Sequence, residues 1–570
     1  MSRSDRRLLA VAAALATAAL AVGIGRTDLW PPDETRVAEI SREMRAERTW
    51  LLPRLNGTPF LEEPPLFYWL QAGAYRLAGG PSAAAARWPA TVAAALGVLV
   101  TMALARAVGA SAGIAALILA TAPEYWWMAR SGTPDTAAAS ATALALTLFF
   151  LAWRSGRRSL LVAAAVTAGT AFWLKSLLGV GLASITIAAF LAWVGRGRLR
   201  TRDVVWAAVA TGSGAALWLV LLWRAEGGGA VAFFVLKNHL GRLVGAPEEG
   251  HLRSALYYVP NLALDLFSWS IALPAAVASA WQERGDPARF FVLLWAGLMT
   301  LALTASASKS AHYLLPAYPA LAVLVAGWWV RAGERLLDRT TWSLLAVVLL
   351  LACPGLGLVL LSLEPNVVMR MVETGSHHPM ALAGELVQVP TGAASWEAAL
   401  LLALLGWGFF AARRARKPAQ AAVAAAACAT ALHIIIVIGV LPQFNLFSST
   451  RPWGEGLGRA ARNGVRLVAF GFPKPETLSP FMFYAGQRIL AVNPGREVEA
   501  LLAKGAVCVL VRRDAYARLG PSVRELPSTF GMAGGLRFVL VSARSGECPQ
   551  VEPPAGVTRR HGSQGGTPSA

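Results

Sequence analysis

Two neighbouring carboxylates, Asp33 and Glu34, open the stretch of this chain whose residue types and spacing best fit a reaction centre. They follow the first apolar segment and Pro31-Pro32, and Arg36 comes three residues after Asp33. Charge beside hydrocarbon is expensive and is normally functional in membrane proteins. If the stretch is helical, Asp33 and Arg36 share one face. Arg36 could then hold the Asp33 carboxylate in its ionised form, or reach a phosphate group.

Membrane helices are the elements that must position these residues. Of the 570 residues 56% are hydrophobic and only 15% charged, whereas soluble domains carry about a quarter charged residues. The excess of 52 Lys+Arg over 32 Asp+Glu would suggest a nucleic-acid partner in a soluble protein. Here many basic residues lie in short loops between apolar segments, which indicates the cytoplasmic side of a membrane and no nucleic-acid partner.

Apolar runs long enough to cross a bilayer, roughly 17–25 residues each, number about thirteen. They begin near Leu8, Ala86, Ser111, Pro134, Leu160, Leu177, Val204, Leu266, Phe290, Leu314, Trp342, Trp396 and Ala421. Arg-rich loops fall on one side of this pattern, which the positive-inside rule makes cytoplasmic. We therefore expect a multi-pass protein of the bacterial inner (plasma) membrane, with the N-terminus inside and the C-terminal region outside.

Two outer stretches are long, residues 26–85 and 224–265. The first contains Asp33, and its residues 66–77 have the spacing of an amphipathic helix that lies in the membrane interface. The second contains His239 and His251, whose separation fits no recognised metal-binding pattern. We predict no metal there.

The composition changes from about Arg451. Candidate strands over 465–470, 488–492, 507–511 and 537–541, with a helix over 497–502, predict a small extracytoplasmic α/β domain spanning 451–552. The tail 553–570 is rich in Gly, Ser, Pro and Arg, which is typical of disorder. Cys508 and Cys548 could form a disulfide if this region lies outside the cytoplasm.

Three segments together resemble a known family. They are D-E-x-R-x-A-E-I-x-R-E-M from Asp33, P-R-L-N-G from Pro53 and F-x-E-x-P-P-L-x-Y-W from Phe60. In this order and spacing they resemble the first outer loop of glycosyltransferases with the GT-C fold. The match is most similar to the family of the aminoarabinose transferase of lipid A and the protein O-mannosyltransferases. The resemblance implies a polytopic α-helical catalytic domain over residues 1–450.

The resemblance also implies roles for individual residues. Asp33 falls at the family's catalytic position, and Asp135 resembles its second acidic position, with Glu34 and Glu62 as further acidic candidates. For both aspartates, capping of a helix start is the structural alternative. Lys175 and Lys309 lie in short outer loops, where topology does not call for positive charge.

We interpret Lys175, Lys309 and Arg36 as contacts of a donor phosphate. For the two lysines, extension along apolar surface toward water is the alternative, and Arg36 could instead pair with Asp33. The chain departs from the family at Glu63, where the aminoarabinose transferases have Lys, and at Val37, where Tyr is common. These departures weaken any inference about the sugar.

The resulting hypothesis is an inverting glycosyltransferase at the outer face of the inner membrane. It would move a sugar from a polyprenyl-phosphate donor to lipid A, another envelope glycan or a protein hydroxyl, without a metal or cofactor. The alternative is a transporter or flippase of lipid-linked sugars. Transporters tend to place ionisable groups at the membrane midplane and to contain internal repeats, whereas the candidate charges here cluster at one surface.

Overall fold

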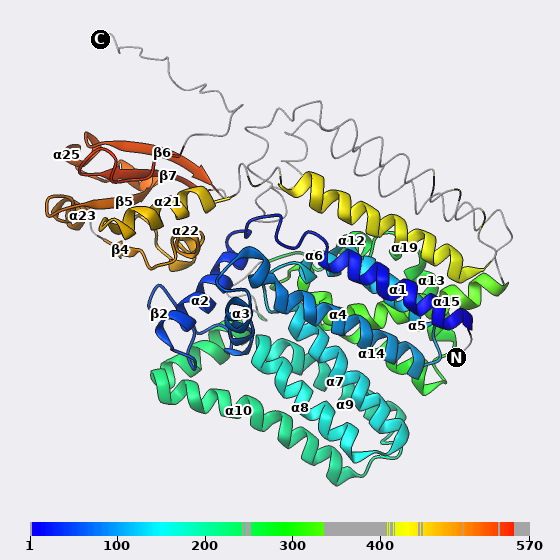
Figure 1. The fold of residues 1–570 in the computed structure, drawn as a ribbon. Coiled ribbons are helices and arrows are strands. Elements are labelled where there is room, and N and C mark those ends of the chain that lie inside the picture. Colours follow the sequence, from blue (N-terminus) through cyan, green and yellow to red (C-terminus); the bar gives the residue numbers. More distant parts are fainter. Residues whose placement is uncertain are drawn as a thin grey trace. The chain divides into compact units, whose positions relative to one another are not determined.

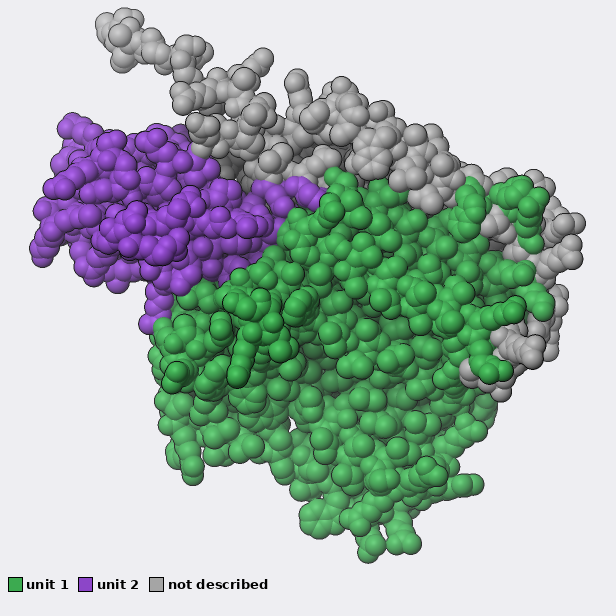
Figure 2. Space-filling model, in the orientation of Figure 1, with its two compact units in different colours: residues 1–27, 37–361, 392–441 green, residues 28–36, 362–391, 442–570 purple. Residues whose placement is uncertain are grey.

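The computed structural model describes residues 3–241, 244, 252–335, 407, 410, 414, 417–442, 445, 449–493, 495–533 and 536–551. These residues form two compact units (Figure 2). The described residues of 1–27, 37–361 and 392–441 make unit 1, and those of 28–36 and 442–570 make unit 2. A boundary near Pro442 lies close to the predicted start of the C-terminal domain, but nothing in the sequence analysis assigned residues 28–36 to that part of the chain.

Unit 1 is built from helices. Its longer ones are α1 (Arg3–Ala21), α4 (Ala83–Ala107), α7 (Asp135–Ser155), α8 (Arg158–Lys175), α9 (Leu177–Val194), α10 (Thr201–Ala232), α14 (Pro287–Ala305), α15 (Tyr318–Arg335) and α19 (Pro418–Ile435). Helix α10 continues into a π-helical segment, η1 (Phe233–Gly241). Among the described residues, seven helices are long and apolar enough to cross a membrane. The chain is thus a helical membrane protein, while the count of about thirteen spans stays a prediction.

These helices pack as neighbours in a consistent order. Helices α4, α7, α8 and α10 lie side by side in that sequence, and α1 packs against α5 (Ala112–Thr121) and α19 (Figure 1). Aromatic rings fill the contact between α7, α9 and α14: Phe150 stacks on Phe291 at 4.8 Å, and Phe190 meets Phe291 edge-on at 5.0 Å. Buried aromatic pairs of this kind contribute packing energy between neighbouring helices.

Two of the predicted spans are broken rather than continuous. The run from Ser111 ends as helix α5 at Thr121, and a short α6 (Pro123–Ala129) follows. Pro123 has no N–H to continue the first helix, and Ala122 before it is extended, as the residue before proline prefers. The run from Leu266 likewise contains only η2 (Ser270–Ala272) and α13 (Leu273–Gln282), after α12 (Tyr258–Asp265). The predicted spans from Trp342 and Trp396 lie outside the described residues.

Basic loops that the sequence places on one side do meet in unit 1. The Arg154 guanidinium donates to the carbonyl of Ala107 at 2.7 Å, joining the ends of α7 and α4. Arg158 at the start of α8 pairs with Asp203 at the start of α10 at 3.6 Å. The predicted grouping of these loops is therefore present in the fold.

A carboxylate explains why the P-R-L-N-G segment accompanies the acidic helix. Helix α2 (Asp33–Glu47) carries Glu43, which accepts the N–H groups of Asn56 and Gly57, each at 2.8 Å. Asn56 and Gly57 form the turn between strands β1 (Arg54–Leu55) and β2 (Thr58–Pro59), with φ of 52° and 81°. Asn-Gly is the favoured pair for such left-handed hairpin turns.

Helix α3 (Leu66–Leu77) is the helix predicted for the first outer stretch. Its apolar residues Leu70 and Leu77 are 46% and 84% exposed, which fits a face turned toward lipid. Its opposite face buries Gln71, which accepts from the Ser41 hydroxyl at 2.6 Å and donates to the carbonyls of Ala86 and Gly132 at 2.8 and 2.9 Å. One amide therefore joins α2, α3, α4 and the turn before α7.

Unit 2 contains a five-stranded sheet in the order β4-β3-β5-β7-β6. The strands are β3 (Arg466–Phe470), β4 (Leu490–Val492), β5 (Val507–Arg512), β6 (Ser528–Ala533) and β7 (Leu536–Ser542). Strand β3 pairs in parallel with β4 and β5, and β7 pairs antiparallel with β5 and β6. The four predicted strands are confirmed and β6 was missed. Cys508 and Cys548 form a disulfide.

Alternate residues of this sheet face two helical layers. Val509, Val511 and Val539 pack with α23 (Gly495–Leu502) and the short helices α24 (Arg513–Tyr516) and α25 (Pro521–Arg524). On the other face, Phe538 of β7 meets α21 (Arg451–Arg462) and α22 (Ser479–Ala485). The period of two along each strand produces this division.

The Gln71 network predicts a measurable loss of stability. Gln71→Leu removes three hydrogen bonds from a buried site, and we expect the free energy of unfolding to fall by about 1–3 kcal/mol. Denaturant unfolding of the purified protein in detergent measures this. Gln282→Leu, at the exposed end of α13, is the matched control and should change little; equal losses in both variants would contradict the role of the network.

Candidate functional site

A buried ion pair joins the ends of two neighbouring helices in unit 1. Asp135 is the first residue of α7 and Lys175 the last of α8, and the Lys175 ammonium donates to an Asp135 carboxylate oxygen. Glu63 lies 3.9 Å from the same ammonium. The Asp135 side chain is only 7% exposed and that of Lys175 20%. One cation therefore holds two carboxylates at the point where the helices meet.

Two further side chains complete this group. The Tyr68 hydroxyl donates to Glu63 at 3.0 Å, and His312 Nε2 lies 3.6 Å from Asp135 Oδ1. The other ring nitrogen of His312 bonds the Ser310 hydroxyl at 3.0 Å. We call Glu63, Tyr68, Asp135, Lys175 and His312 the Asp135 cluster. Its members come from the first outer stretch, α3, α7, α8 and η3 (Ala311–Ala317).

The geometry decides between the alternatives for Asp135 and Lys175. Pro134 is the N-cap residue of α7, and no side chain caps that helix start. The Asp135 carboxylate meets Lys175 and His312 instead. Lys175 is turned into the protein rather than along its surface, so extension toward water is not its role.

The second outer stretch packs beside this cluster. His239 Nε2 bonds the hydroxyl of Ser176, the residue after Lys175, at 2.8 Å, and Asn238 donates to the carbonyl of Glu62 at 2.8 Å. The first contact ties the second outer stretch to the turn after α8, and the second ties it to the first outer stretch. His251 lies outside the described residues. Among the residues that are described, no group of three or more His, Cys, Asp or Glu side chains is arranged to hold a metal.

Lys309 is placed differently from Lys175. It is 3% exposed, and its ammonium donates to the carbonyl of Ser306 and, at 3.5 Å, to that of Arg253. These bonds fasten the loop before η3 to the second outer stretch, so a buried structural role accounts for its position. Its predicted contact with a donor phosphate stays a prediction.

Asp33 and Arg36 lie in unit 2 and pair with each other at 2.8 Å. Asp33 begins α2 as its first residue, and its side chain is 60% exposed. Its carboxylate turns to Arg36 rather than to the free amides of the helix start, so capping does not explain it. Glu34, by contrast, is buried and accepts the N–H of Trp30 at 2.9 Å, which gives it a structural part in the turn.

A further carboxyl that the sequence did not single out lies at the end of the second outer stretch. Asp265 is 8% exposed and accepts a hydrogen bond from the Tyr318 hydroxyl at 3.1 Å. Burial raises its pKa to about 7, against the bond from Tyr318, which lowers it. Asp265 can therefore gain or lose a proton near neutral pH.

Three members of the Asp135 cluster, Glu63, Tyr68 and His312, were not predicted as site residues. Tyr68 lies inside the F-x-E-x-P-P-L-x-Y-W segment and His312 inside the stretch from Ser308 to Pro316. Glu63 and Tyr68 lie in a segment that carries the family resemblance, which was the available signal for them. The partners of Tyr68 and His312 depend on how α3 packs against α4 and α8 and how η3 packs against α7, and the spacing of residues along the sequence does not reveal that packing.

Comparisons with known proteins can now be set beside this geometry. Residues 62–223 match the model of the dolichyl-phosphate-mannose-protein mannosyltransferase family. An undecaprenyl phosphate-alpha-4-amino-4-deoxy-L-arabinose arabinosyl transferase of Sodalis glossinidius is 31% identical over 356 residues, covering 58% of this chain and 62% of the relative. The corresponding protein of Pectobacterium carotovorum is 29% identical over 348 residues, with 58% and 61% covered. The chain spans about three fifths of the length of these curated relatives.

Solved structures extend the likeness over nearly the whole chain. ArnT from Cupriavidus metallidurans bound to undecaprenyl phosphate superposes with a TM-score of 0.73 at 20% identity, covering 95% of this chain and 99% of that one. The chain has the ArnT fold. The apo form of ArnT matches similarly, with a TM-score of 0.71. The resemblance to GT-C transferases of the aminoarabinose transferase type is thus confirmed.

The ion pair of the Asp135 cluster predicts a non-additive effect on stability. Lys175→Met or Asp135→Asn alone disrupts a buried pair, a loss of about 3–5 kcal/mol, whereas removing both partners is far less costly than the sum. Unfolding of the three variants in detergent measures this. Glu63→Gln, which keeps a partner for Tyr68, is the control and should be tolerated. Additive losses would show that the two side chains act independently.

Proposed function

We propose that this chain is an inverting glycosyltransferase that takes a sugar from a polyprenyl-phosphate donor. The observation that carries the proposal is the ArnT fold over 95% of the chain, together with acidic and basic side chains at the positions where the family resemblance expects them. The structure of ArnT with undecaprenyl phosphate supports a lipid phosphate as the donor's carrier. The acceptor is a hydroxyl of lipid A, of another envelope glycan or of a protein.

In the proposed reaction, the acceptor oxygen attacks the anomeric carbon of the donor sugar. The bond from that carbon to the phosphate oxygen breaks, polyprenyl phosphate leaves, and the configuration at the carbon inverts. Asp33 takes the proton of the acceptor hydroxyl. Its 60% exposed carboxylate is open to an acceptor, and Arg36 beside it orients the group.

The leaving phosphate needs positive charge. Lys175 is the cation of the Asp135 cluster, and its side chain at the end of α8 remains 20% exposed. Glu63 shares that ammonium, so the chain balances charge differently from transferases with Lys at this position. The identity of the donor sugar therefore does not follow from the resemblance.

The disulfide in unit 2 supports the proposed orientation. Cys508 and Cys548 pair across 5.2 Å between Cα atoms, and disulfides persist outside the cytoplasm. We infer that unit 2 lies on the outer side of the bacterial inner membrane, where lipid-linked sugars meet envelope acceptors. A transporter would need no release of polyprenyl phosphate, and the ArnT fold favours the transferase over that alternative.

Asp33→Asn tests the proposed base. The substitution keeps the size of the side chain and removes its basicity, so we expect sugar transfer to fall by about 10²–10⁴-fold with unfolding unchanged. The measurement is release of polyprenyl phosphate from a synthetic lipid-linked sugar by the purified protein in the presence of acceptor. Asp514→Asn is the control, because Asp514 is an exposed aspartate of unit 2 that pairs with Arg512. Wild-type turnover by Asp33→Asn would rule out Asp33 as the base.

Cysteine labelling in intact spheroplasts tests the orientation. Lys504→Cys, on the exposed surface of unit 2, should react with a maleimide that cannot cross the membrane. Arg157→Cys, in the exposed loop between α7 and α8, should react only after permeabilisation. The reverse pattern would show that the sides are assigned the wrong way round.

A further inference from the structure

The segment that carries Asp33 belongs to the C-terminal unit. Residues 28–36 are more than 400 positions away from residues 442–570 in the chain, yet they group with them in unit 2 (Figure 2). Helix α2 therefore starts within unit 2 and continues as part of unit 1. The proposed base lies in its first turn.

Asp28 anchors the segment on the N-terminal side of Asp33. Its N–H donates to the Asn445 side-chain oxygen at 3.0 Å. Its carboxylate accepts from the Ser449 hydroxyl at 2.7 Å and from the Arg451 guanidinium at 3.4 Å. Three residues at the beginning of the C-terminal part thus hold one residue of the segment.

Helix α22 supplies the anchors closest to Asp33. The N–H of Leu29 donates to the Tyr484 hydroxyl at 2.8 Å, and the Thr35 and Ser479 hydroxyls bond each other at 3.2 Å. Leu29, Thr35 and Ser479 are almost completely buried. Asp33 therefore lies between two attachments to one helix, while its own carboxylate stays exposed.

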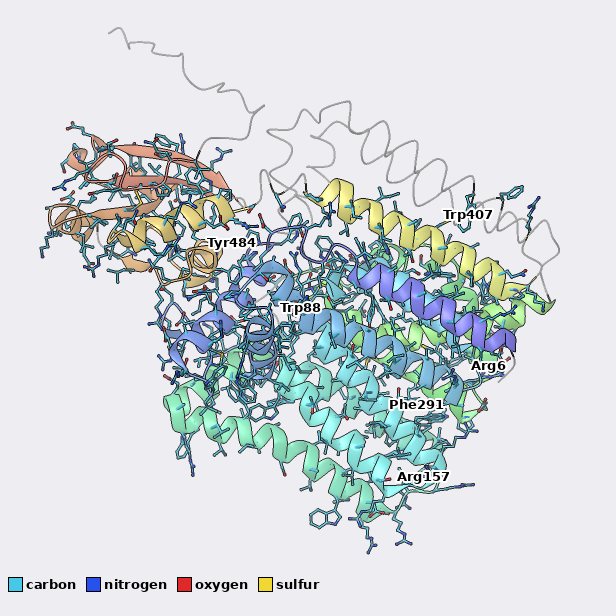
Figure 3. All side chains as sticks on the ribbon, viewed as in Figure 1. Arg6, Trp88, Arg157, Phe291, Trp407 and Tyr484 are labelled. Atoms are coloured by element: carbon cyan, nitrogen blue, oxygen red, sulfur yellow. A yellow bond between two sulfur atoms is a disulfide. The ribbon has the colours of Figure 1, made fainter. Side chains whose placement is uncertain are left out.

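The position of α22 is itself tightly determined. A Cβ atom on Gly454 of α21 would lie 2.5 Å from the Cβ of Tyr484, and one on Gly458 would lie 2.6 Å from the main chain of α22. Glycines at these places let the two helices approach closely. On the side of the sheet, Phe481 meets Phe538 of β7 edge-on at 5.0 Å. Figure 3 labels Tyr484 on this helix.

We propose that unit 2 positions the catalytic base, with Tyr484 and Ser479 as positioning residues. The proposal rests on the proposed function. Neither side chain contacts Asp33; they act through the main chain of Leu29 and the hydroxyl of Thr35. Transfer requires the base and the reacting atoms in a near-attack arrangement, in which a displacement of about 1 Å can lower the rate 10²-fold. The part of unit 2 formed by residues 442–551 is therefore part of the active machinery, although the proposed base itself comes from the segment 28–36.

The test uses Tyr484→Phe and the double variant Tyr484→Phe/Ser479→Ala in the full-length protein in detergent. Loss of one hydrogen bond should lower kcat about two- to ten-fold, and loss of both should lower it roughly ten-fold or more. KM for the lipid donor should stay within about two-fold of the wild-type value, because the donor phosphate is bound by other residues. A fall in donor affinity with kcat unchanged would overturn the proposal.

Two controls separate positioning from a general weakening of unit 2. Tyr516 and Ser542 donate to carbonyls within unit 2, at 3.2 and 2.8 Å, and bond no residue of 28–36. Tyr516→Phe and Ser542→Ala remove the same chemical groups and should keep wild-type kcat. Loss of kcat in these controls equal to that in the α22 variants would mean that unit 2 merely folds less well, and would overturn the proposal.

Amide hydrogen exchange gives a readout that does not depend on activity. Peptides covering residues 28–36 should exchange several-fold faster in Tyr484→Phe than in Tyr516→Phe, while peptides of β3 and β5 stay unchanged. Unchanged exchange in 28–36 would overturn the attachment. If the wild-type protein released no polyprenyl phosphate, the proposed function would fail, and with it the role of unit 2 in catalysis, even where exchange confirmed the attachment itself.

Discussion

A charged side chain beside hydrocarbon is stable only when it has a partner of opposite charge. The Asp135–Lys175 ion pair provides that partner for both residues. An ammonium or carboxylate taken from water without a partner costs several kcal/mol, and the Asp135–Lys175 bond holds the start of α7 and the end of α8 together. Glu63 brings the first outer stretch to the same ammonium, and His312 brings η3 to the same carboxylate. The arrangement of four segments thus follows from one buried cation.

The proposed base obeys a different constraint. Asp33 has to remain accessible to an acceptor, so it cannot be fixed by burial of its own side chain. Its neighbours hold the segment in place instead. Leu29 and Thr35 are buried and hydrogen-bonded to α22, and Glu34 accepts the N–H of Trp30. An exposed reactive group on a segment held at both sides combines access with a defined position. A mixed α/β unit is a physical means to that end, since apolar helices have few polar groups that can bond to a loop.

The sequence predicts local structure and motifs better than partners. The apolar runs, the helix over residues 66–77 and four strands of unit 2 follow from periodicity alone, and the helix and strands lie where periodicity places them. Periodicity fails at Pro123, where one predicted span breaks, and at β6, in which Thr529 is the one β-branched residue and Gly531 weakens the strand pattern. The attachment of residues 28–36 to α22 joins positions more than 400 residues apart, and no local signal encodes such a contact. The sequence also does not distinguish Lys175 from Lys309, because both follow from the same kind of short predicted loop. In the structure Lys175 pairs with carboxylates, whereas Lys309 donates to main-chain carbonyls.

Glu63 makes the charge balance of the Asp135 cluster specific to this chain. With Glu63 and Asp135 ionised and Lys175 protonated, the cluster carries one net negative charge unless His312 also binds a proton. A phosphodiester donor adds another negative charge. Lys at position 63 would have reversed the sign of this balance and favoured phosphate directly. Under the proposed function, a phosphate that approaches Lys175 competes with two carboxylates for the same ammonium. The proposed phosphate contact therefore requires Glu63 or Asp135 to give up part of its contact with Lys175.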